Sequence, residues 1–102
     1  MIIYVDIDET ICINDSLDSS LPRDYAKSKP ITKNISKINK LYDEGHTIIY
    51  WTARGTLTKV DWSDITKKQF SDWGVQYHQI LFGKPHYDLF ICDKSFNPKE
   101  WG

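Results

Sequence analysis

Two aspartates one residue apart follow the first apolar run of the chain, and a pair of carboxylates at this spacing could do chemistry. Residues 2–5 are apolar or aromatic, and Asp6 and Asp8 come next. Side chains at positions i and i+2 of an extended segment point the same way, so both carboxylates are expected to face one pocket. Carboxylates in one pocket repel each other unless a cation or a shared proton compensates. The same spacing is also typical of acids that only end a strand and turn the chain.

Polar residues follow each of the other apolar runs as well. They are Thr52, Arg54, Lys84, Asp93 and Asn97. In open parallel sheets the carboxyl ends of the strands meet at one edge, where ligands bind. The sequence therefore predicts that acids, a hydroxyl group and a lysine gather at that edge. Each residue alone has a plainer interpretation, and for Arg54 a surface ion pair is as good an interpretation as a substrate contact.

The elements that would position these residues follow from the apolar pattern. Continuous apolar runs predict buried strands at residues 2–5, 47–51, 77–82 and 88–92. Helical spacing of apolar residues predicts helices near residues 31–42 and 61–73. This order predicts an α/β fold, a Rossmann-like three-layer sandwich with a mainly parallel sheet. Residues 11–30 are expected to form a long loop, with a short turn or hairpin at 11–13.

Length and composition narrow the class of protein. The 102 residues predict a single domain over 1–102. A net charge of −1 without a basic tract argues against nucleic-acid binding. No apolar run is long enough for a membrane span or a secretory signal, so a cytoplasmic protein is expected. Cys12 and Cys92 fit a reducing compartment as free thiols, and with His78 and His86 they match no common zinc spacing.

The polar residues after the strands resemble the four motifs of the haloacid dehalogenase superfamily, whose members are mostly Mg²⁺-dependent phosphatases. The matching segments are Asp6-Ile7-Asp8-Glu9-Thr10, Thr52 after its apolar strand, Gly83-Lys84-Pro85, and Phe90-Ile91-Cys92-Asp93. The resemblance covers nearly the whole chain. It departs in the last motif, where family members often carry a second acid before Asp93 or about four residues after it. This chain has Cys92 and Asn97 at those places.

The resemblance implies hydrolysis of a phosphomonoester through an aspartyl phosphate. Asp6 is then the nucleophile, and Asp8 protonates the leaving group and later activates water. The implied cofactor is Mg²⁺, bound by Asp6, the backbone carbonyl of Asp8 and Asp93. Asn97 would hydrogen-bond a water molecule on the metal or supply a neutral ligand.

Three further residues would contact the substrate. Thr52 and Lys84 would hold the phosphoryl oxygens as their charge redistributes. Arg54, two residues past Thr52, would grip a second anionic or hydroxyl group.

The gaps between the motifs bear on substrate and assembly. Neither residues 11–30 nor the stretch from Thr52 to Lys84 could hold a full cap domain, so the chain resembles the capless subclass of the family. Residues 24–27, 40–46 and 87–91 also resemble small phosphatases linked to capsule or polysaccharide biosynthesis. The expected partner is therefore a small phosphorylated metabolite, such as a sugar phosphate. A homo-oligomer with loop 11–30 near the contact would let a neighbouring subunit serve as the lid.

Two other classes remain open from the sequence. A receiver-like phosphoacceptor domain also places acids, a threonine and a lysine on a parallel sheet. An interaction domain with a decayed site would account for Cys92 and Asn97. Asp8 favours the enzyme, because an acid two residues from the nucleophile serves turnover rather than storage of a phosphoryl group.

Overall fold

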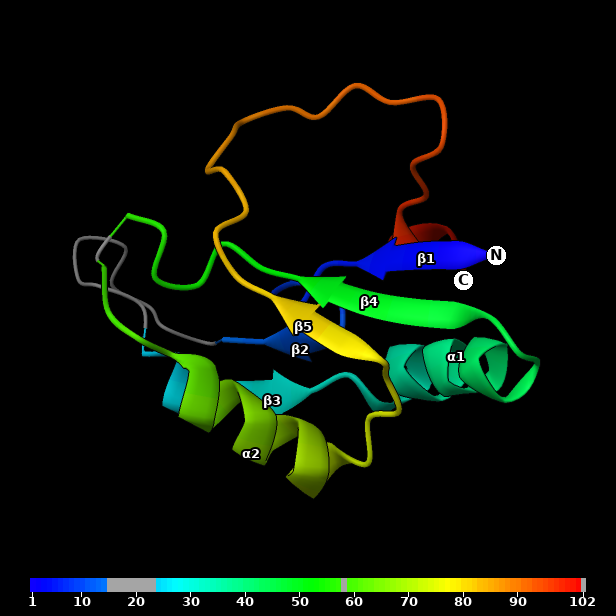
Figure 1. Ribbon diagram of the computed structural model, residues 1–102, viewed down its shortest axis with the longest axis horizontal. Helices are drawn as coiled ribbons and strands as arrows, with labels where there is room; N and C mark the ends of the chain where they lie inside the picture. The colour runs from blue at the N-terminus through cyan, green and yellow to red at the C-terminus, as the bar shows by residue number, and fades with distance from the viewer. Residues whose placement is uncertain (15–23, 58, 102) are drawn as a thin grey trace.

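In a computed structural model of the chain, a three-stranded parallel sheet lies at the centre of the fold (Figure 1). The structure describes residues 1–14, 24–57 and 59–101. The strands are β1 (Ile2–Val5), β4 (Thr47–Trp51) and β5 (Gln79–Leu81), in the order β1-β4-β5. All three run the same way, so their carboxyl ends meet at one edge, as the sequence predicts. The third strand is shorter than the predicted run of residues 77–82.

The core lies on one face of this sheet. Ile48 and Tyr50 of β4 point into it, next to Ile3 and Val5 of β1 in the parallel register. The ring of Tyr50 packs edge-on against Phe70, with 4.8 Å between the ring centroids. A run of β-branched and aromatic residues fits a central strand such as β4, because these side chains pack well on a pleated surface.

Two helices cover that face. They are α1 (Thr32–Asp43), which contributes Ile35 and Ile38, and α2 (Ser63–Trp73), which contributes Phe70. Both lie close to the predicted ranges, and Figure 1 shows them on the same side of the sheet. In the described part of the chain, no helix lies on the opposite face, so the predicted three-layer sandwich is a two-layer α/β arrangement here.

The segment before α1 contains a second, small sheet. Strand β2 (Cys12–Ile13) pairs antiparallel with β3 (Lys29–Pro30), and the short helix η1 (Tyr25–Lys27) precedes β3. The predicted turn or hairpin at residues 11–13 therefore contains a strand, whose register partners lie 18 residues after Cys12 and 16 residues after Ile13. Residues 15–23 of the predicted loop, and with them part of its predicted oligomer contact, lie outside the described residues.

The predicted fourth strand at residues 88–92 is not formed. From Gly83 to Asn97 the chain has neither helix nor strand, and the short helix η2 (Pro98–Trp101) follows. Figure 1 shows this segment as a wide arc from β5 to the neighbourhood of β1. Strand β1 is consequently an edge strand. Among the described residues, no helix combines the length and apolar character that crossing a membrane requires.

Candidate functional site

Asp6, the first residue after β1, lies between a hydroxyl group and an ammonium group. Its Oδ2 accepts a hydrogen bond from the Thr10 hydroxyl at 3.2 Å, and its Oδ1 lies 3.4 Å from the Lys84 Nζ. The chain turns back at Glu9, which has a left-handed φ of 65°, and this turn carries Thr10 to Asp6. The Asp6 side chain is 40% exposed, so a molecule from solvent can reach its carboxylate.

Thr52, directly after β4, connects the neighbouring strand to Lys84. The Thr52 N–H donates to the Leu81 carbonyl at 2.9 Å, and the Thr52 carbonyl accepts from the Lys84 N–H at 3.1 Å. The Thr56 hydroxyl holds the Lys84 carbonyl from the other side at 2.9 Å. The side chain of Lys84 therefore projects from a backbone fixed at the carboxyl edge of the sheet, beside Asp6.

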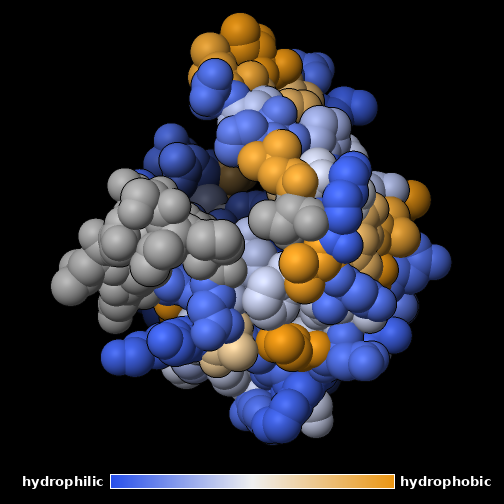
Figure 2. All heavy atoms as spheres, turned by 90° about the vertical axis from the view of Figure 1, so that its left-hand side faces the viewer, coloured by the Kyte–Doolittle hydropathy of each residue, from blue (hydrophilic) through white to orange (hydrophobic). Residues whose placement is uncertain are grey.

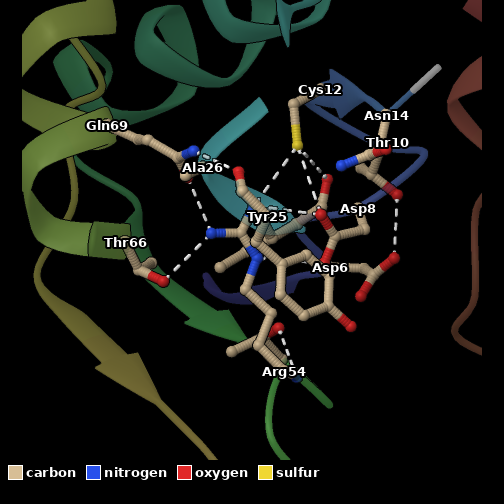
Figure 3. Close-up of polar contacts among 12 residues, drawn as sticks. Asp6, Asp8, Thr10, Cys12, Asn14, Tyr25, Ala26, Arg54, Thr66 and Gln69 are labelled. Carbon is tan, nitrogen blue, oxygen red and sulfur yellow. Dashed lines mark hydrogen bonds and ion pairs between the residues drawn. The ribbon is translucent and has the colours of Figure 1, made fainter. Parts of the chain in front are cut away.

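Asp8 is held by Arg54 through a two-pronged ion pair (Figure 3). The Arg54 Nε donates to Asp8 Oδ2 at 3.1 Å, and the Nη2 donates to Asp8 Oδ1 at 2.9 Å. The Arg54 side chain has no exposed surface, whereas Asp8 keeps 17% of its own. Parallel bonds of this kind fix the orientation of a carboxylate as well as its position.

The Nη1 donors of Arg54 are bound by helix α2, and its Nη2 also donates to the Cys12 Sγ at 3.7 Å. Its Nη1 donates to the Thr66 hydroxyl at 3.0 Å and to the Gln69 side-chain oxygen at 2.7 Å. The guanidinium carbon also lies 4.7 Å from the centre of the Tyr25 ring. In this structure the guanidinium is buried and holds Asp8, and the predicted substrate contact of Arg54 stays a prediction.

Thr66 and Gln69 escape the sequence analysis, although a signal for them exists. They lie three residues apart, on one face of α2, and both are buried next to Phe70. Polar side chains on the buried stripe of a helix require partners inside the protein. Gln69 also donates its amide to the Tyr25 carbonyl, and this bond ties η1 to the helix.

Cys12 lies against the same carboxylate but is not suited to nucleophilic chemistry. Its thiol is 3.5 Å from Asp8 Oδ1 and 3.7 Å from the Ile7 carbonyl. Burial, and then the negative charge of Asp8, raise the pKa of the Cys12 thiol from 9.0 to about 12. The thiolate is the reactive form, so this cysteine stays inert near neutral pH.

The predicted metal ligands do not come together within one chain. Among the described residues, no group of three or more His, Cys, Asp or Glu residues could hold a metal ion. Asp93 and Asn97 are exposed on the arc after β5, whereas Asp6 lies at the end of β1. Within the described residues Asp93 thus does not form such a group with Asp6 and Asp8, and the Mg²⁺ site predicted from these three residues stays a prediction.

A groove of about 830 Å³ runs along β1 and ends at Asp6. The edge of β1 forms one wall, Ile38 and Leu41 of α1 form the floor, and the arc after β5 forms the other wall. Asp6, Thr10 and Lys84 line one end of it. The groove thus leads from a largely apolar channel to the most polar part of the molecule.

Comparison with known proteins finds a solved structure of similar fold. No family model and no curated protein matches the chain. The crystal structure of an MCSG target protein from Vibrio cholerae is similar to it, with a TM-score of 0.82 and 25% sequence identity. The alignment covers 98% of this chain and 85% of that one. The chain has a small α/β fold with a parallel sheet, consistent with the Rossmann-like class.

Proposed function

We propose that this protein hydrolyses phosphomonoesters and that Asp6 is its nucleophile, as its resemblance to haloacid dehalogenase phosphatases implies. The observation that carries the proposal is the contact between Asp6 and Lys84, which lie 78 residues apart in the chain. An exposed carboxylate beside a fixed ammonium group can receive a phosphoryl group whose oxygens the ammonium then holds. Attack by an Asp6 oxygen on phosphorus forms the P–O bond of an aspartyl phosphate and breaks the bond to the leaving oxygen.

Asp8 is the proposed general acid and base. It lies two residues from Asp6, and Arg54 fixes both of its oxygens. A proton on Asp8 goes to the leaving alkoxide, and Asp8 then takes a proton from the water that cleaves the aspartyl phosphate. Thr52 lies between Lys84 and Arg54 in this arrangement, so its hydroxyl is the proposed second donor to the phosphoryl oxygens.

The substrate proposed here is a small phosphorylated metabolite such as a sugar phosphate. A cavity of about 400 Å³ is lined by residues that follow Thr52 and precede Lys84, among them Thr56, Lys59 and Gly83. Arg54, which holds the proposed general acid Asp8, also lines this cavity, so the cavity is the proposed place for the leaving group. Mg²⁺ is the cofactor that the resemblance implies, and it would neutralise phosphate charge. Free thiols at Cys12 and Cys92 agree with the proposed cytoplasmic location.

Release of phosphate from p-nitrophenyl phosphate in the presence of Mg²⁺ tests the proposal. We expect turnover by the wild type and none by Asp6→Asn, because the amide keeps the shape of the side chain but loses its nucleophilic oxygen. Asp8→Asn should lower kcat by roughly 10²-fold or more, the usual effect of losing a general acid and base. Acid quenching of the wild type during turnover, followed by peptide mass spectrometry, should find a phosphoryl group on Asp6.

Asp72→Asn is the matched control, since it removes the same charge from an exposed residue of α2 that forms a surface ion pair with Lys68. This variant should keep wild-type activity. Equal turnover by Asp6→Asn and the wild type would refute the proposal. A stable phosphoryl-Asp6 without phosphate release would instead favour a receiver-like phosphoacceptor, and inactivity of the wild type would favour an interaction domain.

A further inference from the structure

Strand β1 pairs with only one neighbouring strand among the described residues. β1 pairs with β4 on one side, and the groove of about 830 Å³ lies on the other side. The side chains of Ile2 and Tyr4, which alternate with the core-facing Ile3 and Val5, are 71% and 57% exposed on the other face of the sheet. An uncovered edge strand presents unpaired N–H and C=O groups, which natural proteins usually cover or pair. This edge is therefore suited to pairing with a further strand.

The arc after β5 contains an apolar run, residues 88–92, whose sequence is typical of a strand but which pairs with no strand among the described residues. Leu89, Phe90 and Ile91 are 75%, 54% and 88% exposed. Figure 2 shows hydrophobic side chains at the top of the molecule, the end at which Figure 1 draws this arc. Exposed contiguous apolar side chains of this kind mark a site of association. The run and the open edge are complementary in length and in chemistry.

The run cannot reach its own β1 in the direction of the other strands. Lys84 is fixed to Thr52 at the carboxyl edge, so a parallel strand would first have to return across the sheet. Parallel crossovers need a dozen or more residues, and residues 82–87 provide six. The arc instead ends at η2, beside the start of β1 in Figure 1. If it collapsed onto its own β1 it would run antiparallel, carrying Asp93 away from Asp6.

We infer that residues 88–92 of a second copy of this chain add to β1 as a fourth, parallel strand. Residues 82–87 are then the hinge, and the exchange is reciprocal in a twofold dimer. The exchange also moves η2, which has no fully buried residue but whose Trp101 packs against the core and under the Lys37 ammonium group. The same contacts form with the second copy when its η2 takes the vacated place. The exchange buries the apolar run of one copy against the open edge of the other, and it places a fourth strand where the sequence predicts one.

The exchange also completes the candidate site, an inference that rests on the proposed function. Asp6 follows β1, and Asp93 follows the added strand of the second copy. In the parallel arrangement both residues lie at the carboxyl edge of the sheet, next to each other. The missing third acid of the metal site then comes from the other chain. In the same register Tyr4 lies beside Ile91, because Asp6 and Asp93 are each two residues further along.

Cysteine cross-linking tests the strand exchange without reference to activity. Tyr4→Cys and Ile91→Cys are introduced together in a Cys92→Ser background, which removes the exposed native thiol. After mild oxidation we expect a non-reducing denaturing gel to show a product of twice the 12.0 kDa chain mass. Light scattering of the wild type should give the same dimer mass. A monomer in solution, or a disulfide formed only within one chain, would overturn the exchange.

Complementation between variants tests whether Asp93 acts across the dimer. Asp6→Asn and Asp93→Asn chains, each inactive alone, are co-expressed with different tags and purified together. A mixed dimer contains one site with Asp6 and Asp93 both intact, so random pairing should restore about a quarter of wild-type activity. The matched control pairs Asp6→Asn with Asp8→Asn, whose residues belong to one chain and should restore none.

The outcomes separate the two proposals. An interchain disulfide with restored activity in the first mixture supports both the exchange and the role of Asp93. An interchain disulfide without restored activity overturns the role of Asp93 and leaves the exchange standing. If the wild type itself releases no phosphate, the proposed function fails, and the disulfide still decides the exchange.

Discussion

At the scale of single residues, contacts connect the side chains and backbone groups of the candidate site to one another. Asp6 contacts Lys84, Lys84 is bonded to Thr52 through its backbone, and Arg54 holds Asp8 two residues from Asp6. The residue types and their places after strands predict that Asp6, Thr52 and Lys84 lie together, because the carboxyl edge of a parallel sheet gathers them. They place Asp93 and Asn97 there too, which the structure does not do. They do not predict the partner of Arg54. An arginine near the carboxyl edge of a sheet can point to solvent or into the protein. The position of α2, which supplies Thr66 and Gln69, determines that Arg54 points inward.

Arg54→Lys tests the positioning role that the structure gives this residue. Lysine keeps the positive charge but lacks the planar set of guanidinium donors, so Thr66 or Gln69 loses its hydrogen-bond partner. We therefore expect the free energy of unfolding to fall by about 2–3 kcal/mol. Since the guanidinium is buried against Asp8, kcat should fall while KM changes little. Urea unfolding and steady-state kinetics measure the two effects. A raised KM with unchanged kcat would indicate a substrate contact instead.

Lys68→Ala is the appropriate comparison for the stability measurement. It breaks an ion pair with Asp72 in which both side chains are largely exposed. Exposed pairs of this kind contribute about 0.2–1 kcal/mol, so its effect should be much smaller than that of Arg54→Lys.

At the scale of elements, β4 shows how a central strand forms from its sequence. Ile48, Ile49 and Tyr50 are all buried, and a continuous apolar run is typical of such a strand. The predicted ranges of β1 and β4 agree with the structure for this reason. The run at 88–92 has the same character, but an apolar pattern indicates that a strand is buried, not which chain buries it.

Tyr50→Phe tests the one polar atom that β4 buries without a partner. Within the described residues the Tyr50 hydroxyl has no hydrogen-bond partner, so removing it should raise the free energy of unfolding by about 1 kcal/mol. Burial raises the pKa of this phenol above its ordinary value of 10.0. The folded state therefore holds the proton more tightly than the unfolded chain does.

The stability that follows from this proton is complete below pH 10 and is lost as the pH rises above it. The advantage of Tyr50→Phe over the wild type should consequently be constant from neutral pH to about pH 10 and grow above pH 10. Urea unfolding at several pH values measures the difference. A destabilised Tyr50→Phe at neutral pH would show that the hydroxyl has a partner after all.

At the scale of the whole molecule, the predicted α/β class and parallel sheet are confirmed, and the three-layer arrangement is not. One face of the sheet carries both helices, while Tyr4 and Ile2 are exposed on the other face. Sequence patterns describe the chain residue by residue. They do not indicate whether an apolar segment is buried within its own chain or against another molecule. The predicted strand at 88–92, which the structure does not form, is the element for which this matters.

An exchanged dimer should reveal itself in the concentration dependence of thermal unfolding. Because unfolding then separates two chains, Tm should rise with protein concentration by mass action. Differential scanning calorimetry over a hundredfold range of concentration measures this. Ile91→Glu, which places a charge in the exchanged strand, should give a monomer whose Tm is constant. A constant Tm for the wild type would contradict the dimer.

The pairing of β1 with β4 has a consequence for how the chain reaches its fold. Ile2 lies opposite Thr47, so the first strand has no neighbour until some 45 residues later in the chain. Contacts between positions so distant in sequence form slowly, since a long loop has to close first. During synthesis or refolding, β1 is therefore an unpaired apolar segment for longer than any other strand of this sheet. Dilution and low temperature during refolding should protect it from aggregation.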